Sequence, residues 1–495
     1  MQPHILPQLP KSPTGIKGLD EITGGGLPTG RPTLICGSAG CGKTLMAMEF
    51  LVRGIVEYDE PGVFMAFEES KEELAQNVAS LGFNLPKLLE ENKLRIDHVR
   101  VERSEIEETG QYDLEGLFIR LGYAIDTIKA KRVVLDTIET LFSGLSNQAV
   151  LRAELRRLFQ FLKDKGVTAI ITGERGDGKL TRQGLEEYVS DCVILLDNRV
   201  NDQVSTRRLR IVKYRGTTHG TNEYPFLIDH DGISVLPVTS LELKYAASRN
   251  VVSSGVPRLD EMLGSGGFFE GSCILVSGFA GTGKSSIASF FANQTCSEGK
   301  RCLYFAFEES QDQMLRNMAS IGLNLEEHVK NDLLRVQAVS PTIHGLEMHL
   351  VTMHKAIVNF KPSLVIVDPI TNLRTVADCR EVKAMLTRLI YFLKSQGITA
   401  MFTSEIRTTN DVDPDDEGIS SLTDTWLMVR DIEANGERNR GLFVMKSRGM
   451  HHTNRVREFI ISNDGLNLID VVTDSGGNVL VGSARKLHQK TKENK

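Results

Sequence analysis

The strongest constraint on this chain is an eight-residue glycine-rich motif that occurs twice. GSAGCGKT, residues 37–44, and GFAGTGKS, residues 278–285, both match the pattern G-x-x-x-x-G-K-[ST]. Glycines without a Cβ let successive backbone N–H groups turn inward around an anion, and the following helix directs its positive end at the same point. Because this arrangement binds the phosphates of a nucleoside triphosphate, the chain is predicted to have two nucleotide sites.

Each motif also supplies a lysine and a hydroxyl group. We expect Lys43 and Lys284 to reach the β and γ phosphates of ATP, and Thr44 and Ser285 to be ligands of Mg²⁺. The expected nucleotide-binding residues are Gly37, Ser38, Ala39, Gly40, Cys41, Gly42, Lys43, Thr44, Gly278, Phe279, Ala280, Gly281, Thr282, Gly283, Lys284, Ser285 and Ser286.

Further elements recur in the same order at a spacing of about 240 residues. Each half has an apolar strand before the loop, a second strand ending in FEES, and a third apolar run ending in an aspartate. Strands alternating with helices, followed by a run of strands, predict a mainly parallel sheet flanked by helices, with an antiparallel extension. We expect two tandem α/β P-loop domains, residues 1–240 and 241–480, and a flexible basic tail, residues 481–495.

Asp136 and Asp368 end the third apolar run of each half. An isolated aspartate after such a run is usually a strand cap or turn residue. A P-loop upstream favours a different role, in which the carboxylate accepts hydrogen bonds from water bound to Mg²⁺. We therefore expect both residues in the metal sites.

Composition narrows the class of protein. The formal net charge of −6 argues against duplex nucleic acid as the main partner, since such proteins usually carry a basic surface. The seven cysteines form no C-x-x-C pair, as expected for reduced thiols in the cytoplasm. No apolar run approaches the ~20 residues that span a bilayer, so we expect no membrane contact.

The helix end and Lys43 could lower the pKa of Cys41 and make it oxidisable, although most such thiols are merely small loop residues.

Two RecA-like halves that begin with GIKGLDE and GVPRLDE, and that carry FEES and K-x-R-G, resemble the KaiC family of circadian-clock ATPases and autokinases. The resemblance covers nearly the whole chain. It implies a double-ring homohexamer with ATP bound between neighbouring subunits. Cations from the adjacent subunit would then offset charge on the transferring phosphoryl group. These trans-acting residues would be Lys213, Arg215, His219, Lys446 and Arg448. The alternative is that K-x-R-G is a basic strand end in solvent.

The resemblance also assigns roles to the paired carboxylates of FEES. In the family the pair activates the attacking oxygen, so Glu68 and Glu308 would be the chief bases, with Glu69 and Glu309 assisting. Glu308 would in addition contact the metal. The alternative is that each pair is the solvated start of a helix, where the positive end of the dipole favours carboxylates.

The two halves differ before their late apolar strand, which predicts different reactions. When Asp191 is aligned with Asp424, Glu187 and Tyr188 stand opposite Ser420 and Ser421. The family's phosphate acceptors lie at this position. We therefore expect the first ring to hydrolyse ATP and the second also to phosphorylate Ser420 and Ser421. The alternative is a polar turn leading into a strand. The acidic run at residues 411–417 is usual for a solvated loop, although it could disfavour further negative charge.

The C-terminal tail indicates which partner proteins to expect. VLVGSARKL, residues 479–487, approximates the family pattern, but little remains of the longer tail through which clock-type members engage KaiA. We expect activity without KaiA, a KaiB-like protein as a plausible partner, and a frayed, solvated C-terminal end. Two other classes of function stay open: a RecA-type motor driven by nucleic acid, and an ATP-gated switch that recruits a partner with little kinase activity.

Overall fold

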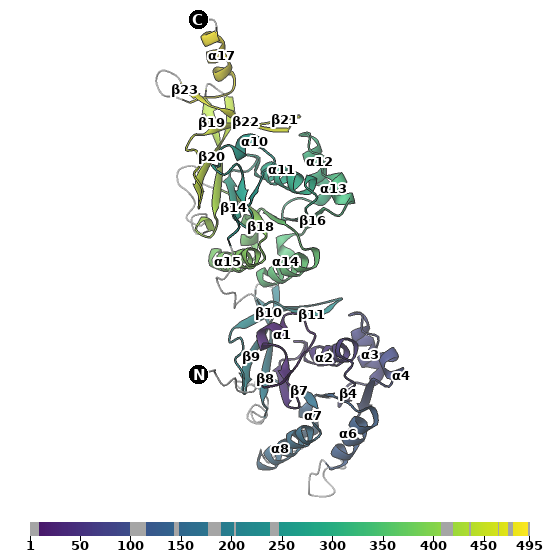
Figure 1. Ribbon diagram of the computed structural model, residues 1–495. Helices are drawn as coiled ribbons and strands as arrows, with labels where there is room; N and C mark the ends of the chain where they lie inside the picture. Colours follow the sequence, from purple (N-terminus) through teal and green to yellow (C-terminus); the bar gives the residue numbers. More distant parts are fainter. Residues whose placement is uncertain are drawn as a thin grey trace, which may run out of the picture. The chain divides into compact units, whose positions relative to one another are not determined.

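The structure is a computed structural model that describes residues 9–99, 115–142, 148–176, 190–201, 204–237, 247–406, 419–434, 437–463, 465–473 and 479–493. The chain divides into two compact units, Met1–Ser240 and Leu241–Lys495 (Figure 1). Each unit contains a nine-stranded sheet. Residues 177–189, 238–246, 407–418 and 494–495 are among those outside the described ranges, so Glu187, Tyr188 and the acidic run at residues 411–417 are not placed.

The first sheet has the strand order β11-β10-β9-β8-β3-β7-β6-β4-β5. Its parallel strands are β3 (Pro32–Gly37), β4 (Gly62–Ala66), β5 (Leu94–His98), β6 (Arg132–Asp136), β7 (Thr168–Glu174) and β8 (Cys192–Asn201). The antiparallel strands are β9 (Val204–Tyr214), β10 (Glu223–Asp229) and β11 (Gly232–Val235). This order confirms the predicted parallel sheet with an antiparallel extension.

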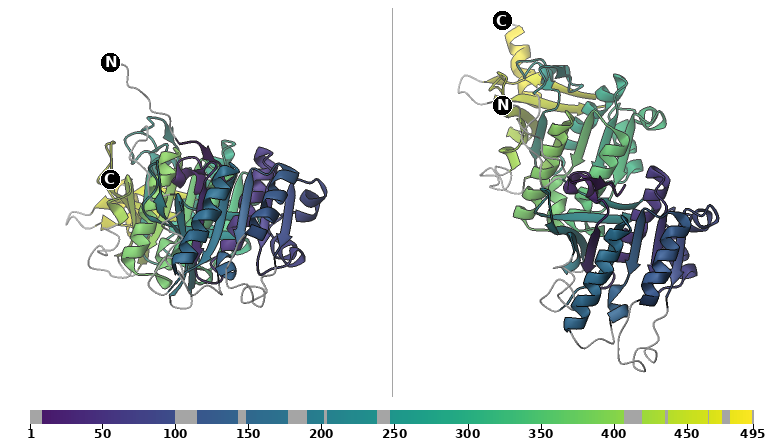
Figure 2. Two further views of the ribbon diagram at one scale, coloured as in Figure 1. Left: turned by 90° about the horizontal axis from the view of Figure 1, so that it is seen from below. Right: turned by 60° about the horizontal axis from the view of Figure 1, so that its bottom comes forward.

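Helices cover both faces of the first sheet because its central strands are apolar on both sides. Ile35 packs with α2 (Lys43–Tyr58), α3 (Lys71–Ala79) and α4 (Leu85–Glu90). Its neighbour Leu34 points to the opposite face and packs with α6 (Glu115–Ile128), α7 (Ile138–Phe142) and α8 (Gln148–Asp164). In the right view of Figure 2, the blue helices α6 and α8 lie over this second face. A short hairpin, β1 (Lys11–Ser12) and β2 (Leu27–Pro28), and α1 (Leu19–Thr23) precede the sheet.

The second unit repeats this plan, with the strand order β16-β15-β17-β18-β14-β19-β20-β21-β22. The parallel strands are β14 (Cys273–Gly278), β15 (Cys302–Ala306), β16 (Leu334–Ala338), β17 (Leu364–Asp368), β18 (Thr399–Glu405) and β19 (Thr425–Ala434). The antiparallel extension consists of β20 (Glu437–Ser447), β21 (Arg457–Ser462) and β22 (Gly465–Asp470). Both units are therefore RecA-like α/β domains.

The connecting elements of the second unit also follow the first. The helices are α10 (Pro257–Asp260), α11 (Lys284–Ser297), α12 (Gln311–Ala319), α13 (Glu326–Lys330), α14 (Leu346–Phe360), α15 (Cys379–Ser395) and α17 (Gly482–Glu493). The short elements are η2 (Pro341–Ile343), η3 (Ile370–Thr375), β12 (Val251–Val252), β13 (Phe268–Phe269), β23 (Val472–Thr473) and β24 (Val479–Leu480). Helices α11 and α12 pack on one face of the sheet, and α15 contacts β18.

The expectation of a frayed, flexible tail is wrong for residues 482–493, which form α17. Arg485 is 6% exposed and its Nε donates to Glu458 Oε2 at 2.8 Å, while Glu458 is itself 1% exposed. The backbone N–H of Gly482 donates to Glu458 Oε1 at 2.9 Å. A buried carboxylate needs such partners, so the first turn of the helix is anchored to β21. Within the described part of the chain, no helix is long and apolar enough to cross a membrane.

Candidate functional site

The two P-loops have the same backbone geometry. Gly42 and Gly283 adopt left-handed conformations, with φ of 102° and 97°, directly before α2 and α11. At the start of the first loop, a Cβ on Gly37 would lie 2.5 Å from both Cys41 Sγ and the carbonyl oxygen of Leu196. Glycine is therefore required where the loop turns against the neighbouring strand and where the helix begins.

Each P-loop lysine is held across the inside of its own loop. Lys43 Nζ donates to the carbonyl oxygens of Gly37 at 3.0 Å and Ser38 at 2.9 Å. Lys284 Nζ makes the same two bonds, to Gly278 at 3.0 Å and to Phe279 at 2.8 Å. Both side chains are largely buried, which places one cation inside each concave loop. An anion of phosphate type fits this position.

The hypothesis that Cys41 is an activated thiol is wrong. Burial raises the pKa of Cys41, and this effect outweighs the nearby Lys43 and the backbone N–H groups that act in the opposite direction. The thiol is buried and packs under the loop. Cys41 is therefore a small packing residue.

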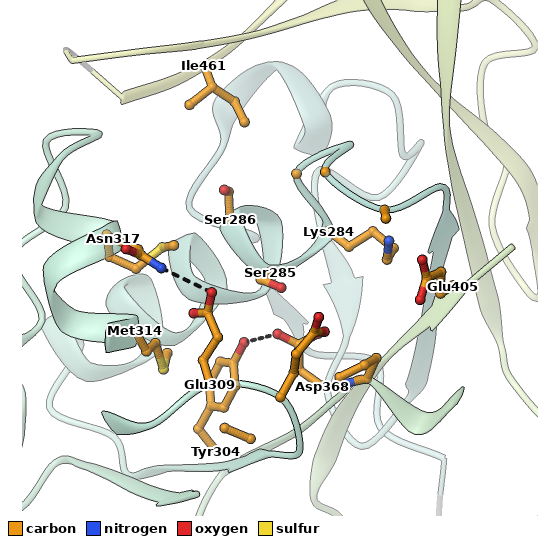
Figure 3. A pocket seen from close by; sticks show the side chains of 17 residues that line it. Lys284, Ser285, Ser286, Tyr304, Glu309, Met314, Asn317, Asp368, Glu405 and Ile461 are labelled. Carbon is orange, nitrogen blue, oxygen red and sulfur yellow. Dashed lines mark hydrogen bonds between the residues drawn. The ribbon is translucent and has the colours of Figure 1, made fainter. Parts of the chain in front are cut away.

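The two strand-end aspartates lie beside the P-loop hydroxyls. Asp136 accepts hydrogen bonds from the hydroxyls of Thr172 and Thr44. Burial raises the pKa of Asp136, those two hydrogen bonds lower it, and the charges of Glu69 and Glu68 raise it further. In the second unit, Asp368 and Ser285 line the same pocket (Figure 3).

This donor set fits Mg²⁺ in a P-loop site. Among the described residues, no group of three or more His, Cys, Asp or Glu side chains is placed to hold a metal ion. Mg²⁺ does not need such a group when it binds with a nucleotide, because one or two carboxylates, a hydroxyl, water and the phosphates complete its shell. The oxygens of Asp136 with Thr44, and of Asp368 with Ser285, are of the right chemical kind.

The second P-loop borders a pocket of about 310 Å³. Lys284 and Ser285 lie at its P-loop end, with Asp368 and Glu405 close by (Figure 3). Met314, Asn317 and Ile461 line other parts of the wall (Figure 3). The pocket therefore combines a cationic loop, acidic groups and an apolar wall, as a site for a nucleotide requires.

The carboxylate pairs lie just before their helices and not in the first turn. Ser70 and Ser310 are the N-caps of α3 and α12, and each forms a capping box. The second carboxylate of each pair is fixed by an asparagine of that helix: Asn77 Nδ2 donates to Glu69 at 3.3 Å, and Asn317 Nδ2 to Glu309 at 3.0 Å. Each carboxylate pair therefore stands immediately before the N-cap of its helix.

The first carboxylates of the two pairs have different surroundings. The hydroxyl of Thr140 on α7 donates to Glu68 Oε1 at 2.8 Å. Glu308 lines the second pocket. Burial, followed by the charges of Asp368, Glu405 and Glu309, raises the pKa of Glu308 against the opposing charge of Lys284. A carboxylate with a raised pKa accepts a proton more readily near neutral pH.

The serine pair lies at the opposite edge of the second sheet from the P-loop. The P-loop follows Gly278 at the end of β14, whereas the backbone N–H of Asp424 donates to the carbonyl oxygen of Cys273 at the start of β14. Five residue steps of a strand cover about 17 Å. Ser420 is 8% exposed and Ser421 is exposed, and both precede Asp424.

The basic residues of KSRG reach this same edge. Lys446 Nζ donates to the carbonyl oxygens of Ser420 at 2.6 Å and Thr423 at 2.9 Å, and Arg448 Nη2 donates to that of Ser421 at 2.8 Å. Burial, and to a lesser extent Arg448, lowers the pKa of Lys446. The structure thus brings the expected trans-acting cations and the expected acceptors together.

The first unit has a related edge. Arg215 forms an ion pair with Asp191 at 3.8 Å, and Lys213 lies near the end of β9. His219 Nδ1 lies 3.0 Å from the carbonyl oxygen of Gly220, and its ring stacks on Tyr214. Asp191 also pairs with Lys163 at 2.6 Å, as Asp424 pairs with Lys394 at 2.8 Å. The matching contacts support the alignment of the two aspartates.

Several residues near the sites were missed by the sequence reasoning. Thr172 and Thr403 donate to Asp136 and Asp368 from the neighbouring strands. Both lie two positions before the last residue of VTAIITGE and GITAMFTSE, so aligning the two repeats could have found them. Thr140 and Tyr304 have no such signal, because the other unit has Asn372 and Phe64 at the corresponding positions.

Comparisons with known proteins agree with this geometry. A family model described as "ATPase: KaiC" matches residues 12–240 and 252–472. The chain is 59% identical to the circadian clock protein KaiC2 of Synechocystis sp. over 96% of this chain and 84% of that protein. It is 40% identical to the circadian clock oscillator protein KaiC of Parathermosynechococcus lividus, over 93% of this chain and 86% of the relative. The KaiC of Synechococcus elongatus is 39% identical over 93% and 89%. This chain belongs to the KaiC family of ATPases.

Proposed function

We propose that this ATPase hydrolyses ATP at its first nucleotide site and phosphorylates itself from its second, with Mg²⁺ at both. At the first site Glu68, assisted by Glu69, accepts a proton from the attacking water. At the second site Glu308, assisted by Glu309, accepts the proton of a serine hydroxyl. The serine oxygen bonds to the γ-phosphorus, the bond between that phosphorus and the β,γ-bridging oxygen breaks, and ADP leaves. Water attacking the phosphoserine would reverse the modification.

The observation that carries the proposal is the position of Ser420 and Ser421 with Lys446 and Arg448 at one sheet edge. Reacting atoms must approach to about 3–3.5 Å. The P-loop of the same chain lies about 17 Å away along β14, and this distance favours transfer from a neighbouring subunit over transfer within one subunit. A neighbouring subunit of a homohexamer would present its P-loop to this edge, and Lys446 and Arg448 would contact its nucleotide in trans.

The first unit would use the corresponding edge in the same way. Lys213, Arg215 and His219 would contact the nucleotide of the adjacent subunit, where their positive charge offsets charge on the transferring phosphoryl oxygens. Aliphatic hydroxyl acceptors are not expected there, since Glu187 and Tyr188 stand at that point of the sequence. Hydrolysis, with water as the acceptor, is therefore the reaction proposed for this site.

We also propose that phosphorylation needs no KaiA and that a KaiB-like protein reads the nucleotide or phosphorylation state. The anchored first turn of α17 supports the first point, because the contacts of Arg485 and Gly482 with Glu458 hold this segment on its own domain. Titrating KaiA should leave the phosphorylation rate unchanged. A KaiA-dependent rate would overturn this part of the proposal.

The test is incubation of the full chain with γ-labelled ATP and Mg²⁺, followed by mapping of the labelled residue. We expect label on Ser420 or Ser421 and loss of label in the Ser420→Ala/Ser421→Ala variant. Label that persists in that variant would contradict the assignment. Negligible turnover and no label would favour an ATP-gated switch, and turnover that rises with DNA would favour a nucleic-acid motor.

A further inference from the structure

The two nucleotide sites differ at one buried position of the strand beside the aspartate. In the second sheet Ala306 on β15 pairs with Asp368, and in the first sheet Ala66 on β4 pairs with Asp136. Two positions earlier in each strand lies an aromatic residue, Tyr304 in the second unit and Phe64 in the first. The second site therefore has a phenol hydroxyl that the first site lacks.

That hydroxyl contacts the aspartate directly. Tyr304 is 1% exposed, and its O–H donates to Asp368 Oδ2 at 2.5 Å (Figure 3). The hydroxyl of Thr403 donates to the other oxygen, Oδ1. A phenol is protonated at neutral pH, since its ordinary pKa is about 10, and therefore acts as the donor. Both oxygens of this carboxylate are thus oriented by neutral hydroxyl groups.

The helix that follows the P-loop also differs between the two units, again by a hydroxyl group in the second unit and an apolar side chain in the first. Ser289 is the sixth residue of α11, whereas the sixth residue of α2 is Met48, and both side chains are fully buried. The second unit therefore has Tyr304 and Ser289 where the first has Phe64 and Met48. Two hydroxyl groups in one unit correspond to two apolar side chains in the other.

The aspartate of the first site is oriented by a different pair of hydrogen-bond donors. Asp136 accepts from Thr172, which corresponds to Thr403, and from the P-loop hydroxyl of Thr44. In the second site, the phenol of Tyr304 supplies the additional donor from the strand β15. The second P-loop hydroxyl, that of Ser285, lines the pocket near Asp368 (Figure 3).

We propose that Tyr304 is a positioning residue for the divalent cation of the second nucleotide site, holding the Asp368 carboxylate toward the cation and the hydroxyl of Ser285. The inference rests on the proposed role of Asp368 in binding Mg²⁺. Residues that orient a metal ligand typically change metal affinity by 10–100-fold when they are replaced. The first site has no counterpart of this phenol and should not depend on it.

The test measures Mn²⁺ binding, as a spectroscopic substitute for Mg²⁺, by electron paramagnetic resonance of the full chain with a non-hydrolysable ATP analogue. Asp136→Ala, which should remove the first class of sites, is used to isolate the second. In that background, Tyr304→Phe should weaken Mn²⁺ binding by about 10-fold. In the matched background Asp368→Ala, which isolates the first class, Tyr304→Phe should leave Mn²⁺ binding unchanged. Equal affinity of the second class with and without the phenol would overturn the inference.

Two controls separate this inference from the proposed function. Asp368→Ala alone should remove the second class of Mn²⁺ sites; if the class remains, the metal role of Asp368 itself fails. Fluorescence of Trp426, the single tryptophan of the chain, checks the fold of the second unit. If Tyr304→Phe alone lowers the unfolding midpoint, the double variant Tyr304→Phe/Ser289→Met is measured instead, because it recreates the Phe64 and Met48 pair of the first unit. It should weaken Mn²⁺ binding to the second class of sites by the same factor.

Discussion

Lys446 Nζ donates to the carbonyl oxygen of Ser420 at 2.6 Å, and this contact joins a basic strand end to a hydroxyl pair. Arg448 extends the contact to Ser421. The arrangement lies at the edge of the sheet opposite the P-loop of the same chain. Under the proposed transfer, the P-loop that faces this edge belongs to a second subunit.

The cations of this edge should be needed for phosphoryl transfer. An arginine finger delivered in trans contributes 10³–10⁵-fold to the rate of related enzymes, because it offsets charge that develops in the transition state. We expect Arg448→Ala to lower phosphorylation of Ser420 and Ser421 by about 100-fold or more. Arg448→Lys is the matched control and should restore part of the rate. Unchanged labelling in Arg448→Ala would show that the arginine acts only on the backbone of Ser421.

The two carboxylate pairs should act at separate sites. Removing a general base typically costs 10²–10⁴-fold. We expect Glu68→Gln to lower steady-state ATP hydrolysis by about 100-fold at the first site while labelling of the serines continues. Glu308→Gln should lower labelling of the serines while ATP hydrolysis at the first site continues. Rates of phosphate release and of label incorporation, measured on hexamers of each variant, distinguish the two. Equal losses of both activities in both variants would contradict this division of roles.

The second unit should lose stability in acid through His354. Burial lowers the pKa of His354 to about 4, whereas a histidine in an unfolded chain titrates near 6.5. The folded state favours the neutral ring, so this stability is full above about pH 6.5 and is lost as pH falls toward 4. The loss amounts to about 3 kcal/mol at most.

The measurement is urea unfolding followed by Trp426, which lies in the second unit and is buried. His354→Gln should reduce the difference in unfolding free energy between pH 7 and pH 4.5. The ring of His349 is also buried and its pKa is also lowered by burial, so the comparison is between wild type and variant at each pH. An identical pH dependence in both proteins would rule out a contribution from His354.

The buried pair of Arg485 and Glu458 should stabilise the C-terminal helix. Removing one partner of such a pair leaves an unpaired buried charge and typically costs 3–5 kcal/mol. We expect Arg485→Met to destabilise the second unit by about 3 kcal/mol. Arg485→Met/Glu458→Leu, which leaves no charge behind, should recover much of the loss. A single variant as stable as wild type would show that Glu458 finds other partners.

Much of the fold could be predicted because its strands are continuous apolar runs of the kind that a sheet covered on both faces requires. The conformation of the P-loop could be predicted from its motif, because its first glycine lies where a side chain would collide with the next strand. Strand β5, Leu94–His98, could not be identified in this way. Its apolar residues alternate with charged ones, and it lies at the edge of the sheet.

The remaining contacts of the site depend on pairs that are distant in the sequence. Tyr304 and Asp368 are joined only when β15 pairs with β17, and Thr140 reaches Glu68 only through the turn after β6. The anchoring of α17 was missed for the same reason. A run of lysines and arginines predicts a solvated end, unless one of its members, here Arg485, finds a buried carboxylate elsewhere in the fold.

Phosphoryl transfer between subunits is tested most directly in mixed hexamers. One chain carries Glu308→Gln and intact serines; the other carries intact Glu308 and Ser420→Ala/Ser421→Ala, with a tag that separates the two by mass. Neither should incorporate label alone from γ-labelled ATP. After co-assembly, label should accumulate on the Glu308→Gln chain, because its serines face an intact site on the neighbour. Absence of label in the mixture, while wild-type hexamers are labelled, would contradict phosphoryl transfer between subunits.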